Sequence, residues 1–126
     1  MSDFEIAPSL LAADFGYLMR DIKAVEGKTN YLHLDVMDGH FVDNLSIGVP
    51  VVESIRRYTD MFFDVHLMLT NPEKFVKAFA DAGANTLKIS CAVSGKSAAT
   101  RFFGTGFSLR LITTRRVCLS SSLVLS

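Results

Sequence analysis

Two short apolar segments of the chain carry histidine and aspartate side chains at alternating positions. Residues 31–37 read YLHLDVM, and residues 61–68 read MFFDVHLM. Successive side chains of a β-strand point to opposite faces, so His33 and Asp35 share one face of the first segment. His66 occupies the equivalent polar face of the second segment. Two imidazoles and one carboxylate suit zinc or another transition metal. The pattern therefore predicts a metal site.

A simpler interpretation exists for each of these histidines taken alone. A single histidine in a strand is more often a satisfied core residue than a ligand. In a parallel sheet, however, both faces of a core strand are normally apolar, and an isolated charge there is costly unless it is paired or bound to metal. Two histidines near the ends of successive strands, with Asp35 beside them, favour the metal site. Asp38 and His40 are interpreted as turn and loop residues, and Met37 and Met68 first as core residues.

The elements that position these residues alternate between strands and helices. Hydrophobic spacing, turn residues and capping residues predict four strands with three helices between them. The strands are expected at residues 4–11, 31–37, 61–68 and 86–90, and the helices between Asp14 and Gly27, at Pro50–Tyr58, and between Asn71 and Gly83. The buried stripe of the third helix is predicted to consist of Phe75, Ala78, Phe79 and Ala82.

A unit length of about thirty residues requires parallel strands joined by crossover helices. The fold class is therefore α/β, with an open doubly wound sheet or a barrel as the two architectures. The dinucleotide-binding version of the open sheet has no support, because no G-x-G-x-x-G sequence follows the first strand.

Composition and length place the chain among globular proteins. It has 126 residues, of which 49% are hydrophobic, and this excludes a disordered chain and favours a single domain. No apolar run approaches the roughly 18 residues that cross a bilayer, and acidic residues near the start argue against a secretory signal. Two widely spaced cysteines predict neither a disulfide framework nor a zinc knuckle. A cytoplasmic location without membrane contact is expected.

Four segments resemble the ribulose-phosphate 3-epimerase family. They are APSLLAADF at Ala7–Phe15, HLDVMDGHFVDN at His33–Asn44, DVHLM at Asp64–Met68 with NPE shortly after it, and DAGAN at Asp81–Asn85. The resemblance implies a (β/α)8 TIM barrel, of which residues 1–90 would form about the first four β/α units, a truncated half-barrel. It also implies an isomerase of the pentose phosphate pathway that interconverts D-ribulose 5-phosphate and D-xylulose 5-phosphate.

The resemblance assigns roles to individual residues. His33, Asp35 and His66 match three of the family's four ligands to a divalent metal ion, with Zn, Fe(II), Mn and Co left open. Asp35 also matches one of two catalytic acid/base carboxylates, one on each side of the planar intermediate formed when the C3 proton leaves. The metal would stabilise the negative charge on the substrate oxygens. The residues expected to contact the sugar phosphate are Ser9, Met37, His66 and Met68.

The resemblance ends after Ser90, and charge changes at the same point. Residues 1–90 carry eight Lys/Arg and thirteen Asp/Glu, whereas residues 91–126 carry five Lys/Arg and no acidic residue. We expect this tail to be a frame-shifted or disordered segment foreign to the family. Its basic residues are scattered, so no nucleic-acid partner is predicted.

Several alternatives for the function stay open. The chain could be an inactive fragment, a related hexulose-phosphate 3-epimerase, or a non-catalytic binding module. The open sheet edges of a half-barrel predict self-association in any of these cases.

Overall fold

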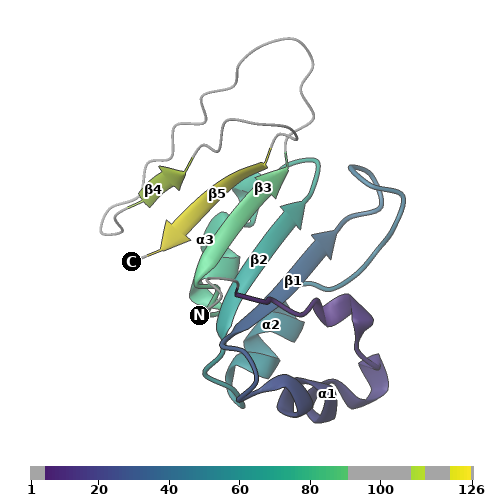
Figure 1. The fold of residues 1–126 in the computed structure, drawn as a ribbon. Coiled ribbons are helices and arrows are strands. Elements are labelled where there is room, and N and C mark those ends of the chain that lie inside the picture. Colours follow the sequence, from purple (N-terminus) through teal and green to yellow (C-terminus); the bar gives the residue numbers. More distant parts are fainter. Residues whose placement is uncertain (1–4, 91–108, 113–119, 126) are drawn as a thin grey trace.

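The computed structural model describes residues 5–90, 109–112 and 120–125. Its strands form one sheet in the order β1-β2-β3-β5-β4 (Figure 1). The strands are β1 (Tyr31–Met37), β2 (Phe62–Met68), β3 (Thr86–Ser90), β4 (Leu109–Ile112) and β5 (Ser120–Leu125). β1, β2 and β3 are parallel, whereas β5 is antiparallel to both β3 and β4. The parallel core confirms the α/β class.

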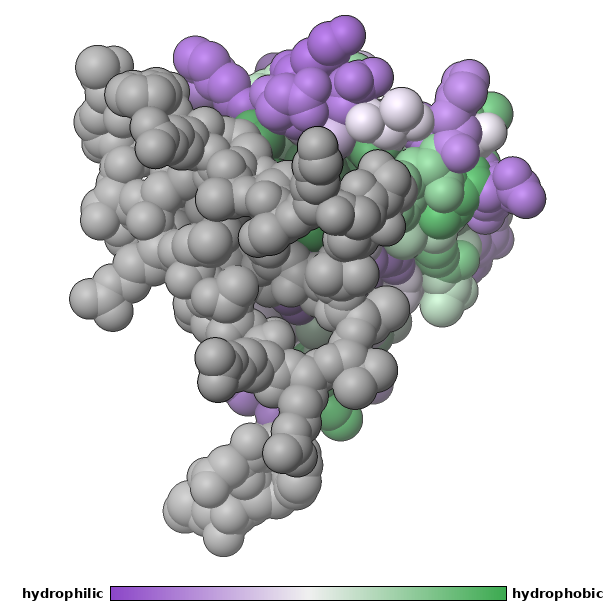
Figure 2. Space-filling model, turned by 90° about the horizontal axis from the view of Figure 1, so that it is seen from above, coloured by the Kyte–Doolittle hydropathy of each residue, from purple (hydrophilic) through white to green (hydrophobic). Residues whose placement is uncertain are grey.

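The α-helices of the described residues are α1 (Leu18–Val25), α2 (Val49–Arg56) and α3 (Val76–Asp81). In Figure 1 the helices α2 and α3 lie behind the parallel strands, and α1 lies below them. Each follows or precedes a parallel strand, as crossover connections require. Seen from above, hydrophilic side chains gather along the upper margin of the molecule (Figure 2). Each helix has exposed polar residues, such as Arg20, Glu53 and Lys77, beside its buried ones, so it packs one side on the sheet and presents the other to solvent.

The hydrophobic core lies between the sheet and these helices. On β1 the alternate residues Leu32, Leu34 and Val36 are buried, and the residues between them are half-buried. The strands β2 and β3 and the helices complete the core with Phe63, Val65, Leu67, Leu87, Ile22, Val52, Ile55 and Phe79. Burial of each large apolar side chain contributes roughly 1.5–3 kcal/mol. The apolar faces thus fix which way the polar faces of β1 and β2 point.

Most element predictions are confirmed. Strands are found at 31–37 and 86–90 as expected, and β2 begins at Phe62, one residue later than predicted. The predicted Pro50–Tyr58 helix begins one residue earlier and ends at Arg56. Gly27 and Gly83, expected to end helices, have positive φ angles of 84° and 102°.

The predicted first strand, residues 4–11, is wrong as a regular strand over its described residues. Ser9 forms a single parallel bridge with His33, whose backbone N–H donates to the Pro8 carbonyl over 2.8 Å. Pro8 has no N–H to extend a ladder. The Ser9 hydroxyl then accepts the backbone N–H two residues on, which starts a 3₁₀ turn at Leu10–Ala12. The capping serine therefore ends the extended segment after one bridge.

The predicted buried stripe of the third helix is wrong at Phe75. Phe79 and Ala82 are 1% and 6% exposed, but Phe75 is 43% exposed. A 3₁₀ turn at Pro72–Lys74 precedes α3 and has tighter winding than the α-helix assumed from the spacing. Val76 packs against the core instead.

Predictions for the chain after Ser90 fall largely outside the described residues. Within them, β5 pairs with β3 from Thr86 opposite Val124 to Ser90 opposite Ser120. The boundary between residues 90 and 91 and the foreign origin of the tail stay predictions. No helix in the described part of the chain is long and apolar enough to cross a membrane.

Candidate metal centre

The parallel register of β1 and β2 brings the polar residues of both strands together. Partner residues face each other as His33 with Asp64, Asp35 with His66, and Met37 with Met68. Because side chains alternate along a strand, all of these lie on the sheet face opposite the hydrophobic core. One face of two adjacent strands therefore holds the whole predicted ligand set.

The three predicted ligands converge on one point. His33 Nε2 lies 3.1 Å from Asp35 Oδ1, and His66 Nδ1 lies 3.3 Å from the same oxygen. One donor atom from each residue lies within 4.8 Å of the others. Lone pairs that face one another need a positive charge between them, either a proton or a metal ion. Metal–ligand bonds of about 2.0–2.2 Å place neighbouring donor atoms about 3.0–3.4 Å apart, so this donor set fits a divalent metal.

Ser9 belongs to the same cluster. Its bridge to His33 brings the Ser9 hydroxyl next to β1, where it donates to Asp35 Oδ2 over 3.0 Å. The two carboxylate oxygens of Asp35 are thus differentiated, because Oδ1 faces the imidazoles and Oδ2 faces the hydroxyl. The structure places Ser9 with the predicted ligands, although the regular strand expected to carry it is not formed.

Three further residues, Asp64, Lys88 and Ser90, support the histidines. No role in the site was predicted for any of them from the sequence. His33 Nδ1 contacts Asp64 Oδ2 at 2.8 Å, and Lys88 Nζ donates to the same oxygen over 2.6 Å. His66 Nε2 lies 2.7 Å from Ser90 Oγ. Alternation along β3 puts Lys88 and Ser90 on one face, so the pattern that identified the ligands could also have identified these two.

The two imidazoles have different electrostatic surroundings. The hydrogen bond to Asp64 raises the pKa of His33, whereas burial lowers the pKa of His66. Burial alone would raise the pKa of Asp64, but His33 and Lys88 outweigh it and the pKa is lowered. Asp64 is therefore a carboxylate that accepts hydrogen bonds. His66, with the lower pKa, loses its proton to a metal at less cost.

The two methionines lie one step along the strands beyond the ligands. Met37 and Met68 end β1 and β2 and are half-buried. Ser46, from the loop after β1, accepts the Met37 backbone N–H over 3.0 Å and donates to the Asp35 carbonyl over 2.6 Å. This loop is therefore fastened beside the ligands, at the end of the strands where parallel α/β folds bind ligands. Substrate contact by Met37 and Met68 stays a prediction.

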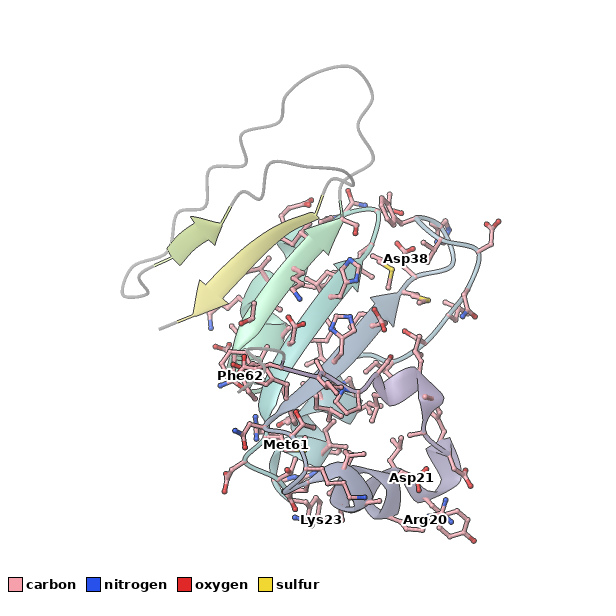
Figure 3. All side chains as sticks on the ribbon, viewed as in Figure 1. Arg20, Asp21, Lys23, Asp38, Met61 and Phe62 are labelled. Atoms are coloured by element: carbon pink, nitrogen blue, oxygen red, sulfur yellow. The ribbon has the colours of Figure 1, made fainter. Side chains whose placement is uncertain are left out.

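Asp38 joins two loops at this end of the sheet. Figure 3 labels it beyond the tip of β1. Its Oδ1 accepts the backbone N–H groups of His40 and Phe41 over 2.9 and 2.8 Å, and its Oδ2 accepts that of Thr70 over 2.8 Å. These N–H groups, led by that of Thr70, hold the pKa of Asp38 well below its usual range. The turn role predicted for Asp38 is confirmed, and the residue also ties the loop after β1 to the loop after β2.

Asp38→Asn should separate the role of Asp38 in its own turn from its role in joining the loop after β1 to the loop after β2. The carbonyl oxygen of asparagine can keep both acceptor contacts of the turn, which leaves the amide NH₂ facing the Thr70 N–H as a second donor. We expect hydrogen exchange at Thr70 to become roughly tenfold faster, with little change at His40 and Phe41. Amide exchange measured by NMR tests this. An unchanged rate at Thr70 would show that the tie between the loops is not made by Asp38.

A hollow of about 540 Å³ lies at the opposite end of the strands. Met61 and Phe62, which line it, are labelled at that end in Figure 3. Some of its polar groups pair with one another, as Thr59 Oγ1 donates to Glu26 and Arg56 donates to the Thr59 carbonyl. In parallel α/β folds the end at which the strands begin serves stability, and the three converging candidate ligands lie toward the other end, so we assign the site to the His33 end.

Comparison with known proteins decides the family. The sequence matches the ribulose-phosphate 3 epimerase family over residues 5–101. The chain belongs to this family. The match continues past Ser90, where the resemblance of the motifs ends. The three parallel strands and their crossover helices are accordingly part of the (β/α)8 barrel of the epimerase family.

Curated members of the epimerase family match the same part of the chain. The ribulose-phosphate 3-epimerase of Bacillus subtilis is 50% identical over 86 residues, which are 68% of this chain and 40% of the relative. That of Mycobacterium bovis is 56% identical over 79 residues, 63% of this chain and 34% of the relative. The rice cytoplasmic isoform is 45% identical over 91 residues, 71% of this chain and 40% of the relative. The chain thus spans well under half the length of these epimerases.

Proposed function

We propose that the protein acts as a metal-dependent ribulose-phosphate 3-epimerase, interconverting D-ribulose 5-phosphate and D-xylulose 5-phosphate. The convergence of His33, Asp35 and His66 on one point carries the proposal. The three relatives described above are named ribulose-phosphate 3-epimerases, which favours a pentulose phosphate over the hexulose phosphate alternative.

The metal would be held by His33 Nε2, His66 Nδ1 and Asp35 Oδ1, the three atoms that face one another. When bound there, a divalent cation supplies Lewis-acid stabilisation of the negative charge that develops on the substrate oxygens. Imidazole and carboxylate ligands suit Zn, Fe(II), Mn and Co alike, so the proposal covers all four.

Asp35 would move the proton at C3. Its Oδ1 faces the imidazoles, and Ser9 is the partner of its Oδ2 among the described side chains. Oδ2 is the atom left to take a proton from the carbon and to return it. The Ser9 hydroxyl holds that oxygen in place and would release it by rotating toward the substrate. Proton transfer by a positioned carboxylate typically contributes 10²–10⁴-fold in rate.

Inversion at C3 needs a second carboxylate on the other side of the planar intermediate. Near the site, Asp64 is paired with His33 and Lys88. The Asp38 carboxylate already accepts hydrogen bonds from three backbone N–H groups. The sequence has no Asp or Glu after Asp81. This observation favours a second candidate, in which the 126-residue chain by itself does not epimerise.

Hydrogen exchange and epimerisation at C3, measured together, separate the two candidates. In D₂O with saturating Mn²⁺ or Zn²⁺, we expect the chain to exchange the C3 hydrogen of ribulose 5-phosphate for deuterium faster than it forms xylulose 5-phosphate. A single base can remove and return a proton on one face. Proton NMR follows both processes. Asp35→Asn, assayed at metal concentrations that saturate it, should slow exchange by roughly 10²-fold or more.

Asp81→Asn serves as the control, because Asp81 is an exposed carboxylate that pairs with Lys77 on its own helix, and this variant should retain most of the exchange. Metal-dependent formation of xylulose 5-phosphate that is lost in the Asp35 variant supports the epimerase proposal, whereas exchange without xylulose 5-phosphate supports the second candidate. No exchange above the metal-only background, with metal bound to the chain, would contradict it and leave the inactive candidate.

The remaining expectations from the sequence concern substrate contacts, partners, domain division and location. Substrate contacts at Ser9, Met37, His66 and Met68, self-association, and the absence of nucleic-acid and membrane partners stay predictions. So do the division into residues 1–90 and 91–126 and the cytoplasmic location. Relatives are named both as a cytoplasmic isoform, in rice, and as chloroplastic, in Arabidopsis thaliana, so similarity alone does not choose a compartment.

A further inference from the structure

Asp64 is a buried carboxylate that the proposed reaction does not use. It lies in the middle of β2, on the polar face of the sheet, and is 8% exposed. Burying a charge is costly unless partners satisfy it. The parallel register sets Asp64 directly opposite His33, one step before the ligand pair Asp35 and His66. Its position therefore suits a role beside the ligands rather than among them.

The contacts of Asp64 fix the orientation of one histidine. Its Oδ2 lies 2.8 Å from His33 Nδ1 and accepts a hydrogen bond from the Lys88 ammonium group over 2.6 Å. Since an ionised carboxylate only accepts hydrogen bonds, Nδ1 must be the protonated nitrogen. The Nε2 lone pair of neutral His33 then points at Asp35 Oδ1, 3.1 Å away, where the ligand atoms converge. The ion pair with Lys88 holds the Asp64 carboxylate in place.

At His66, the second histidine, the ring nitrogen that faces away from Asp35 contacts a hydroxyl and not a carboxylate. This nitrogen, Nε2, lies 2.7 Å from Ser90 Oγ. A hydroxyl both donates and accepts, so Ser90 is compatible with either tautomer of His66. The choice of the protonated nitrogen is therefore imposed at His33 and left open at His66. Carboxylates that accept from a ligating histidine typically hold its ring and strengthen it as a donor.

We propose that Asp64, held by Lys88, is a positioning residue that locks His33 in the Nδ1–H tautomer and so directs Nε2 at the divalent cation. This inference rests on the proposed function, because it presumes that His33 is a ligand. The recognised chemistry is that of a divalent cation with nitrogen and oxygen ligands. Asp64 itself does not touch the metal or the substrate.

The tautomer of His33 can be observed directly. We would record the imidazole ¹⁵N shifts of the full 126-residue chain, without metal and above the titration of the ring, and compare Asp64→Leu with Asp64→Asn. Leucine keeps the approximate size but cannot accept. Asparagine can still present an oxygen to both His33 and Lys88. Zn²⁺ and Mn²⁺ titrations by calorimetry give the affinities.

The wild-type chain should show Nδ1–H at His33, and Asp64→Asn should keep it. Asp64→Leu should lose the single tautomer and bind metal roughly 10–100-fold more weakly. A merely structural role for Asp64 would not change the tautomer. If wild-type His33 carries its proton on Nε2, or if Asp64→Leu keeps the wild-type tautomer, the inference is overturned. The wild-type spectrum can overturn it even if Asp64→Leu fails to fold. Failure of the wild-type chain to bind either metal would instead contradict the proposed function.

Discussion

Replacing His33 by alanine is expected to weaken binding of a divalent metal by at least about 100-fold, more than typical losses at residues that only support a ligand. The variant removes one of three converging donor atoms, and His66 and Asp35 alone leave a two-ligand site. It also leaves Asp64 with Lys88 as its remaining described partner. Calorimetric titration of the 126-residue chain with Zn²⁺, Mn²⁺ and Co²⁺ measures the effect.

His40→Ala is the matched control for this measurement. His40 lies in an exposed loop at the same end of the sheet, and its Nδ1 donates to the Asp38 carbonyl over 3.0 Å within its own turn. It is not part of the ligand cluster found among the described residues. Metal affinity should therefore change by less than about twofold, as for typical surface substitutions. Equal losses in the two variants would mean that the metal is bound nonspecifically and would contradict the site.

Alternation along single strands was enough to predict that the three candidate ligands share one face of the sheet. His33, Asp35 and His66 break an otherwise apolar pattern, and the period of two places them on one face. The pairing of Asp64 with His33 depends instead on the register between two strands. That register is set by how β1 and β2 pack on the helices, which no single segment encodes.

The two errors in the predicted secondary structure have local physical causes. Apolar spacing treats residues 4–11 as a strand, but Pro8 cannot donate to a ladder and Ser9 caps the next turn. The same spacing treats Asn71–Gly83 as one regular helix and so buries Phe75, which the initial 3₁₀ turn leaves exposed. In both places a short side chain–backbone or turn preference prevailed over hydrophobic periodicity.

Phe63→Ala is expected to destabilise the folded chain by about 3–5 kcal/mol. Phe63 is fully buried in the core between β2 and the helices. The Arg56 guanidinium also lies 3.8 Å from the centre of its ring, and this contact would be lost with the ring. Folded domains are typically stable by about 5–15 kcal/mol, so the loss is a large share of the total. Urea unfolding followed by far-ultraviolet circular dichroism measures the change.

Phe75→Ala makes the same substitution at a phenylalanine that is 43% exposed. Its cost should stay near the roughly 0.5 kcal/mol typical of surface changes, because little buried area is lost. Equal destabilisation by the two variants would contradict the assignment of Phe63 to the core and of Phe75 to the surface. Phe63 directly precedes Asp64 on the opposite face of β2. Loss of its packing should therefore also loosen the strand that presents His66, and metal binding by Phe63→Ala should fall in parallel with its folded fraction.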